Sequence, residues 1–196
     1  STNNMSLMDI QNIHQLYVRH GLTQYAGESI CQIQHAWQCA KLAEKAGASP
    51  SQLLAACLHD IGHLISDLPD SPTLQQIDDH HESTGANMLA MVWGSDVSEP
   101  VRLHVQAKRY LVSTKPSYFD RLSPDSVRSL QLQGGRMSAS ELADFEEQDF
   151  YREALQLRIW DEAGKSGRDQ DNAPIEIQLG DLWKWMHSVP VCGPRD

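Results

Sequence analysis

Residues 58–63, LHDIGH, constrain the fold of this sequence more than any other stretch. They end an apolar run that begins at Leu53, so His59, Asp60 and His63 follow directly on residues that belong in a core. Ionisable side chains are tolerated in an interior when a hydrogen-bond partner, an opposite charge or a metal ion compensates for the lost hydration. The sequence therefore predicts a core that supplies such a partner.

Apolar residues recur at helical spacing along nearly the whole chain, and no stretch shows sustained two-residue alternation. The spacing predicts helices over Ile10–His20 and Ser29–Ala46, and Ser49-Pro50 opens the helix that carries the LHDIGH motif. Further helices are predicted at 79–92, from 98 to about 111, from 123 to the glycine pair 134–135, from 138, at 149–163 and at 177–186. Loops are predicted at 66–76, 115–119 and 164–175. In the last helix we expect Trp183 in the core and Trp185 at its rim.

The chain has 196 residues, 40% of them hydrophobic, and no internal linker, which predicts one all-α domain over residues 5–190. Residues 1–4 precede Met5 and are interpreted as an expression remnant. No apolar run approaches the ~18–20 residues of a membrane span. The four cysteines form no C-x-x-C pair, which favours reduced thiols and a cytoplasmic location.

Charge is distributed unevenly along the sequence. The net charge of −10 argues against nucleic-acid or anionic-membrane partners. No Lys or Arg lies between Lys45 and Arg102, whereas seven lie from Arg102 to Arg136. This order is what a cation site beside an anion site would show, although ordinary surface charge explains it equally well.

Several predicted helices carry histidine or aspartate into apolar surroundings. His59 and His63 are four residues apart and Asp60 is three before His63, so their side chains lie on adjoining parts of one face. His81 shares the apolar stripe of its helix and is a better ligand candidate than its neighbour His80. The sequence alone does not exclude His80 as the ligand. The inward groups expected to converge are His35, His59, Asp60, His81, His104 and Asp161.

A metal centre explains these groups together. A single inward histidine is ordinarily a hydrogen-bonded core residue, but one core would have to satisfy all six groups without a common partner. Four imidazoles and two carboxylates are too many for one tetrahedral zinc and include no sulfur. They suit two octahedral ions bridged by Asp60, with iron, manganese or zinc favoured over magnesium or calcium. Two ions ~3.5–4 Å apart would act on one substrate.

The sequence resembles the HD-domain superfamily, whose members share a His, a His-Asp pair and a distant Asp. The matching residues here are His35, His59-Asp60 and Asp161, and His81 and His104 match the extra histidines of two-metal members. Most members are phosphohydrolases, but this chain is similar to a small iron branch that uses dioxygen to cleave phosphonates. The similarity runs through YAGE (25–28), LHDIGHL, HHESTGANML, HVQAKRYL, LQLQGGRMS and LRIWDEAGK; the segment after this last motif is not aligned.

This resemblance implies a single HD-domain helical bundle with a mixed-valent Fe(II)/Fe(III) pair in its core. It implies oxidative cleavage of the C–P bond of 2-amino-1-hydroxyethylphosphonate to glycine and phosphate. One iron, held by His35, His59, Asp60 and Asp161, would be chelated by the substrate, and the other, held by Asp60, His81 and His104, would bind dioxygen. The expected partners are this small aminophosphonate and O2, for a protein that is a monomer or a weak homodimer.

The resemblance also implies the substrate contacts. His63, Lys108, Ser126 and Arg158 match a phosphonate pocket, with the hydroxyl of Ser126 and backbone N–H groups near it at a helix start. Tyr25 would occupy an iron when substrate is absent and Glu28 would pair with the substrate ammonium, which makes a lid. Asp60, Tyr25, Glu28 and His63 are thus the expected catalytic group. Glu28 also reads as a helix N-terminal carboxylate, and Lys108 and Arg158 also read as surface ion pairs.

Three other functions remain open at this point. A phosphohydrolase would use the same ligands to direct hydroxide at a phosphate ester. An oxygenase of the same branch could take an N-methylated hydroxyphosphonate, although Glu28 favours a primary ammonium and a quaternary group calls for an aromatic cage. A catalytically silent nucleotide-sensing module would bind its ligand without metal. Dependence of phosphate release on oxygen separates the oxygenase from the hydrolase.

Overall fold

The structure, a computed structural model, describes residues 9–22, 30–65, 80–169 and 171–192. Within these ranges the chain is all-α as predicted, and the one β-type contact is an isolated bridge between Arg168 and Pro174. The helices are α1 Ile10–His20, α2 Gln32–Lys45, α3 Pro50–Leu58, α4 Ile61–Ile65, α5 His81–Trp93, α6 Ser95–Thr114, α7 Pro116–Phe119, α8 Pro124–Leu132, α9 Ala139–Glu146, α10 Tyr151–Ala163 and α11 Leu179–Met186.

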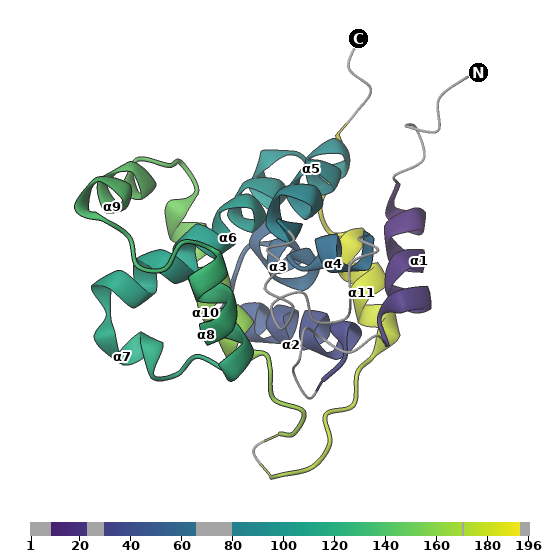
Figure 1. Cartoon of the computed structure of the whole chain (residues 1–196). Helices are drawn as coiled ribbons and strands as arrows, with labels where there is room; N and C mark the ends of the chain where they lie inside the picture. The colour runs from purple at the N-terminus through teal and green to yellow at the C-terminus, as the bar shows by residue number, and fades with distance from the viewer. Residues whose placement is uncertain (1–8, 23–29, 66–79, 170, 193–196) are drawn as a thin grey trace.

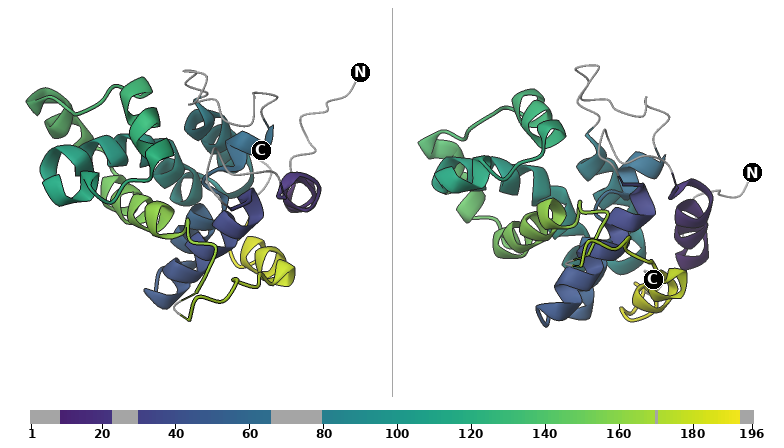
Figure 2. Two further views of the ribbon diagram at one scale, coloured as in Figure 1. Left: turned by 60° about the horizontal axis from the view of Figure 1, so that its bottom comes forward. Right: turned by 90° about the horizontal axis from the view of Figure 1, so that it is seen from below.

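The long helix α6 runs through the middle of the bundle and contacts α3, α5 and α10 (Figure 1). On one side of it lie α7, α8 and α9, and on the other lie α1, α2, α4 and α11, an arrangement that the two rotated views also show (Figure 2). Helices α2, α3, α5, α6 and α10 therefore surround a common interior. No helix among the described residues has the length and apolar character needed to cross a bilayer.

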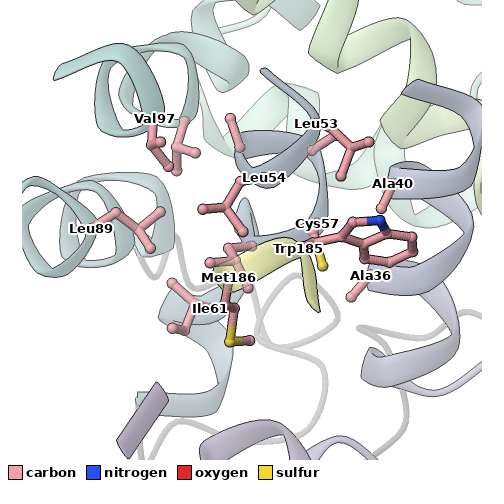
Figure 3. Packing of buried hydrophobic residues seen from close by; sticks show 14 of the residues in the cluster. Ala36, Ala40, Leu53, Leu54, Cys57, Ile61, Leu89, Val97, Trp185 and Met186 are labelled. Atoms are coloured by element: carbon pink, nitrogen blue, oxygen red, sulfur yellow. The ribbon is translucent and has the colours of Figure 1, made fainter. Parts of the chain in front are cut away.

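The main core fills the space between α2, α3, α5 and α11. Small residues Ala36 and Ala40 on α2 face the ring of Trp185, and Leu54 and Met186 meet in the centre of the cluster (Figure 3). Full burial of a leucine or methionine side chain such as Leu54 or Met186 contributes about 1.5–3 kcal/mol to the free energy of unfolding. This cluster holds α11 against the helices that carry the polar groups described below.

The prediction for the two last tryptophans was wrong. Trp185 is 5% exposed and Trp183 is 42% exposed, the reverse of the expected order. The buried stripe of α11 is Leu182, Trp185 and Met186, at steps of three and four residues, and Trp183 falls outside it.

Helix starts follow the capping signals of the sequence. The hydroxyls of Ser49, Ser123 and Ser138 accept the backbone N–H three residues on, and Ser138 with Glu141 forms the predicted capping box. Each cap contributes about 1 kcal/mol to stability. The cap at Ser123 sets the start of α8 next to the polar site.

Three helix boundaries differ from the prediction. Helix α6 begins at Ser95, not near Ser98, because Gly94 at φ 81° turns the chain directly from α5 into α6 and leaves Pro100 inside the helix. Residues 116–119 form the short helix α7 in place of a loop. The motif helix ends at Leu58, and α4 starts at Ile61, so His59 and Asp60 lie in a turn between two helices.

Candidate metal centre

The convergent polar groups come from five parts of the chain. His35 lies in α2, His59 and Asp60 in the turn between α3 and α4, His81 at the start of α5, His104 in α6 and Asp161 near the end of α10. All of them are buried. The turn has a local cause: the His59 ring donates from Nδ1 to the Ala56 carbonyl at 2.7 Å, the carbonyl that a continued helix would offer to the Asp60 N–H.

A first cluster forms around the imidazoles of His35 and His59. Asp161 Oδ1 lies 3.0 Å from His35 Nε2 and 3.2 Å from His59 Nε2. Asp60 Oδ2 lies 3.3 Å and 3.0 Å from the same two nitrogens. One ligand atom from each of the four residues thus lies within 4.8 Å of the others, which is the spacing of a metal site.

A second cluster lies on the other side of Asp60. Its Oδ1 is 3.0 Å from His81 Nε2 and 4.0 Å from His104 Nε2. The ring of His63 stacks on that of His81, with centroids 4.0 Å apart, and its Nε2 lies 3.7 Å from Asp60 Oδ1. The two oxygens of one carboxylate therefore face two separate sets of imidazoles.

The hydrogen bonds of the imidazoles direct their Nε2 atoms to the centre. His35 donates from Nδ1 to the Gly164 carbonyl at 3.0 Å and His104 from Nδ1 to the Val101 carbonyl at 2.6 Å, as His59 does to Ala56. Since a carbonyl oxygen can only accept, Nδ1 carries a proton in each ring, and Nε2 can offer its lone pair to a metal. A hydrogen bond from the second ring nitrogen to a carbonyl is the usual arrangement of a metal-binding histidine.

The position of Gly164 depends on its missing side chain. A Cβ on Gly164 would lie 2.6 Å from Cys39 Sγ and 3.1 Å from the Trp160 carbonyl oxygen. Helix α10 can therefore approach α2 closely enough for the Gly164 carbonyl to reach His35.

Charge also favours a cation at this centre. Burial raises the pKa of Asp161, but Arg158 and His59 outweigh it and hold that pKa well below its usual range. Burial likewise opposes ionisation of Asp60, whose pKa His59 and His35 hold well below the usual value. For the described residues, Asp60 Oδ2 is buried without a hydrogen-bond partner. Two buried carboxylates with such an open oxygen are a donor set that fits metal ions.

His81 and His80 have different environments. The structure places His81 beside Asp60, and His80, exposed and in the left-handed conformation at φ 49°, precedes α5 and lines a cavity of about 560 Å³ with Arg102 and Arg109. Asp60 thus faces His81 and not its neighbour.

A group of buried polar side chains around Lys108, Ser126 and Arg158, called the cationic pocket below, adjoins the first cluster. Arg158 Nε lies 3.6 Å from Asp161 Oδ2, and its Nη2 donates to the Ser126 hydroxyl at 3.3 Å. Lys108 donates to the Ser126 carbonyl at 3.2 Å and to the Ser129 hydroxyl at 2.7 Å. Lys108 and Arg158 are 4% and 2% exposed, so their interpretation as surface ion pairs was wrong. The Ser126 backbone N–H donates to the Ser123 cap, and the Ser126 hydroxyl donates to Glu162 at 3.1 Å.

Burial and neighbouring cations change the protonation of this pocket. Burial, with Arg158 and Lys165 nearby, lowers the pKa of Lys108 to about 7. Burial raises the pKa of Glu162, but Arg158 and Lys165 bring it down to about 2. At neutral pH the pocket thus holds a carboxylate, two cations and a lysine near its midpoint.

Glu162 and Lys165 belong to this pocket and were missed by the sequence reasoning. Lys165 donates to the Ser126 hydroxyl at 2.6 Å and to Glu162 Oε2 at 2.9 Å. A signal was present: Glu162 follows Asp161 directly, four residues after Arg158 and three before Lys165, on one helix face. The predicted lid residues Tyr25 and Glu28 lie outside the described residues.

The chain is similar in sequence to one known family and to proteins with named activities. The family model described as HD domain matches residues 33–157. A hydroxymethylphosphonate dioxygenase of Gimesia maris is 43% identical over 157 residues, which cover 80% of this chain and 78% of that protein. A [1-hydroxy-2-(trimethylamino)ethyl]phosphonate dioxygenase (glycine-betaine-forming) of Leisingera caerulea is 40% identical over 182 residues, 93% of this chain and 87% of that protein.

Proposed function

The chain belongs to the HD-domain family, and on that premise we propose that it is a dioxygenase that cleaves the carbon–phosphorus bond of a 1-hydroxyalkylphosphonate. The observation that carries the proposal is the placement of Asp60, whose two oxygens face separate sets of imidazoles beside a buried cationic pocket. Similarity to two phosphonate dioxygenases, over 80% and 93% of the chain, supports the reaction class.

Two iron ions are the proposed cofactor, in the mixed-valent Fe(II)/Fe(III) state. His35, His59, Asp161 and one Asp60 oxygen would hold the first ion, and His81, His104 and the other Asp60 oxygen the second. Bound there, the pair supplies the redox chemistry that dioxygen requires. Cys39 Sγ also lies 3.7 Å from His35 Nε2. The proposed ligands themselves are imidazole nitrogens and carboxylate oxygens, which fit iron in this role.

The chain's own residues bind and orient the substrate. Lys108, Arg158 and the Ser126 hydroxyl would bind the phosphonate, because they form the cationic pocket beside Asp161. His63, stacked on His81, would contact the substrate from the side of the second cluster. As the family resemblance implies, we expect Glu28 to pair with the substrate ammonium and Tyr25 to occupy an iron when substrate is absent.

The first candidate substrate is 2-amino-1-hydroxyethylphosphonate. With one O2 it gives glycine and phosphate: the C–P bond breaks, the carbon that carried phosphorus is oxidised to a carboxylic acid, and dioxygen is reduced. The names of both relatives contain a hydroxyl on the carbon bearing phosphorus, and one contains a trimethylamino group. The N-trimethyl analogue is therefore the second candidate, and the hydroxyphosphonate group is the shared chemistry.

The test is phosphate release from three compounds by the iron-loaded protein, with and without oxygen. The compounds are hydroxymethylphosphonate, 2-amino-1-hydroxyethylphosphonate and its N-trimethyl form. We expect one phosphate per O2 consumed, with the primary amine turned over at the highest kcat/KM. Phosphate release that continues without oxygen, or release from phosphate esters alone, would replace the oxygenase by a hydrolase.

A further inference from the structure

Glu162 joins α8 to α10 at the edge of the cationic pocket. Its Oε1 accepts a hydrogen bond from the Ser123 backbone N–H at 2.6 Å, where α8 begins. Its Oε2 accepts from the Ser126 hydroxyl at 3.1 Å, from Arg158 Nη2 at 2.8 Å and from Lys165 at 2.9 Å. The Glu162 side chain is 10% exposed, so protein groups satisfy most of the carboxylate.

One nitrogen of Arg158, with its two N–H groups, is left over once these bonds are made. Its Nη2 is shared between Glu162 and Ser126, and its Nε faces Asp161. Within the part of the chain that the structure describes, Nη1 is buried and has no hydrogen-bond partner. An unpaired donor on a buried guanidinium is costly, and a bound anion at that position would satisfy it.

The guanidinium geometry makes Glu162 the anchor of this donor. A guanidinium is planar with its N–H groups in a fixed fork, so holding Nη2 on Glu162 also fixes the direction of Nη1. Ser126 depends on the same carboxylate through its hydroxyl, while its carbonyl accepts from Lys108. Of the three groups proposed to bind phosphonate, Arg158 and Ser126 thus hydrogen-bond directly to Glu162.

We propose that Glu162 is a positioning residue of the phosphonate pocket, which orients Arg158 Nη1 toward the substrate without contacting the substrate itself. The inference rests on the proposed function in that the ligand of the pocket is the substrate phosphonate. A carboxylate next to an anion site repels the anion, so its retention here requires the orienting role to outweigh that repulsion.

The experiment measures binding of inorganic phosphate to the iron-loaded protein by calorimetry, together with metal content. Glu162→Gln keeps the size of the side chain and removes its charge, and Glu162→Asp keeps the charge on a shorter side chain. We expect phosphate to bind about tenfold more weakly to both variants, because charge-assisted bonds that hold Arg158 are lost. Iron content is expected to stay at the level of the unaltered protein. Glu153→Gln, in the first turn of the same helix, is the matched control.

A double-variant cycle with Arg158→Ala separates positioning from general stabilisation. If Glu162 acts through Arg158, the Gln substitution weakens phosphate binding little further once the arginine is gone. Additive losses would overturn the inference, and so would unchanged or tighter binding in the Gln variant, which would make Glu162 a competitor of the anion. Loss of iron from the Gln or the Asp variant would also overturn it.

Phosphate binding does not require turnover, so the two proposals fail separately. A protein that binds phosphate through Glu162-oriented groups but releases no phosphate from any hydroxyphosphonate would refute the oxygenase alone. A protein that turns over a hydroxyphosphonate with unchanged KM in the Gln variant would refute the role of Glu162 alone.

Discussion

At the scale of single residues, His80 and His81 are adjacent at the start of α5, but only His81 is placed to be a metal ligand. His80 takes the left-handed conformation at φ 49°, which costs roughly 1–2 kcal/mol for a residue with a side chain. His81, one residue on, lies 3.0 Å from Asp60. Their substitution should therefore have opposite consequences.

We expect His80→Gly to keep the full metal content and to raise the free energy of unfolding by up to about 1 kcal/mol, because glycine adopts this conformation without strain. His81→Ala should retain about half of the metal, because one cluster loses a ligand. Metal analysis and chemical denaturation of both proteins measure these outcomes. Metal loss from the glycine variant would show that His80 is the ligand.

We expect Lys108 to make phosphonate binding depend on pH. Its pKa is lowered to about 7 by burial and by Arg158 and Lys165, so it loses its charge as pH rises through 7. We expect the KM for the phosphonate to increase by about tenfold between pH 7 and pH 9, which is the worth of one hydrogen bond to a charged group. Lys108→Arg stays protonated over this range and should flatten the profile. A wild-type profile that is equally flat would contradict the prediction.

The lowered pKa of Lys108 also determines how the stability of the folded protein changes with pH. Between pH 7 and about 10, the lysine of the unfolded chain holds its proton and the folded lysine does not. Stability from this group therefore rises with pH across that window and is lowest below pH 7, where a buried ammonium must be kept.

The sequence predicted the residue types of the centre better than their partners. Six inward groups could be found because histidine and aspartate on apolar faces are conspicuous. Glu162 was missed because a carboxylate on a charged stretch of helix looks like ordinary surface charge until α8 is placed against it.

At the scale of elements, the approach of α4 to α5 sets the position of His81. A Cβ on Gly62 would overlap the His81 carbonyl oxygen and lie 2.8 Å from its carbonyl carbon. Those are backbone atoms, which cannot move aside as a flexible side chain does. Gly62 thus lets the two helices meet closely enough for His81 to reach Asp60.

We expect Gly62→Ala to lower stability by about 1–3 kcal/mol and to reduce metal content toward one ion per chain, because α5 must shift away from Asp60. Gly180→Ala is the control, since a Cβ there meets nothing within 4 Å. It should be neutral or stabilising by up to about 1 kcal/mol. Thermal unfolding and metal analysis report both effects, and full metal content in the Gly62 variant would refute the placement argument.

Helix prediction succeeded where local chemistry decides and failed where packing does. Serine caps at Ser49, Ser123 and Ser138 marked helix starts correctly because the capping bond is made within four residues. The start of α6 was misplaced because Pro100 reads as a first-turn residue, whereas the chain turns at Gly94. The break after Leu58 depends on a ring-to-carbonyl bond of His59 that no spacing rule indicates.

At the scale of the whole molecule, the candidate metal centre lies where helices from distant parts of the sequence meet. Its proposed ligands come from α2, the turn after α3, α5, α6 and α10, which span His35 to Asp161. Ions at this point would therefore act as cross-links between distant parts of the chain.

We expect a chelator to lower the melting temperature by about 5–10 °C, which corresponds to metal present at about a hundredfold above its Kd in a domain of this size. Added Fe(II) should restore it. An Asp60→Ala protein should melt at one temperature with or without chelator, because both clusters lose the shared carboxylate. A chelator effect of full size in that variant would contradict a bridging role.

The shared carboxylate also limits how such a protein can change over generations. If Asp60 serves both clusters, a lineage that loses His81 or His104 keeps a first cluster that can still bind an ion. A lineage that loses Asp60 loses a ligand from both clusters in one step. Descendants reduced to a single ion should then still encode aspartate at this position. Their ancestors should have lost His81 of α5 or His104 of α6 before any ligand of the first cluster.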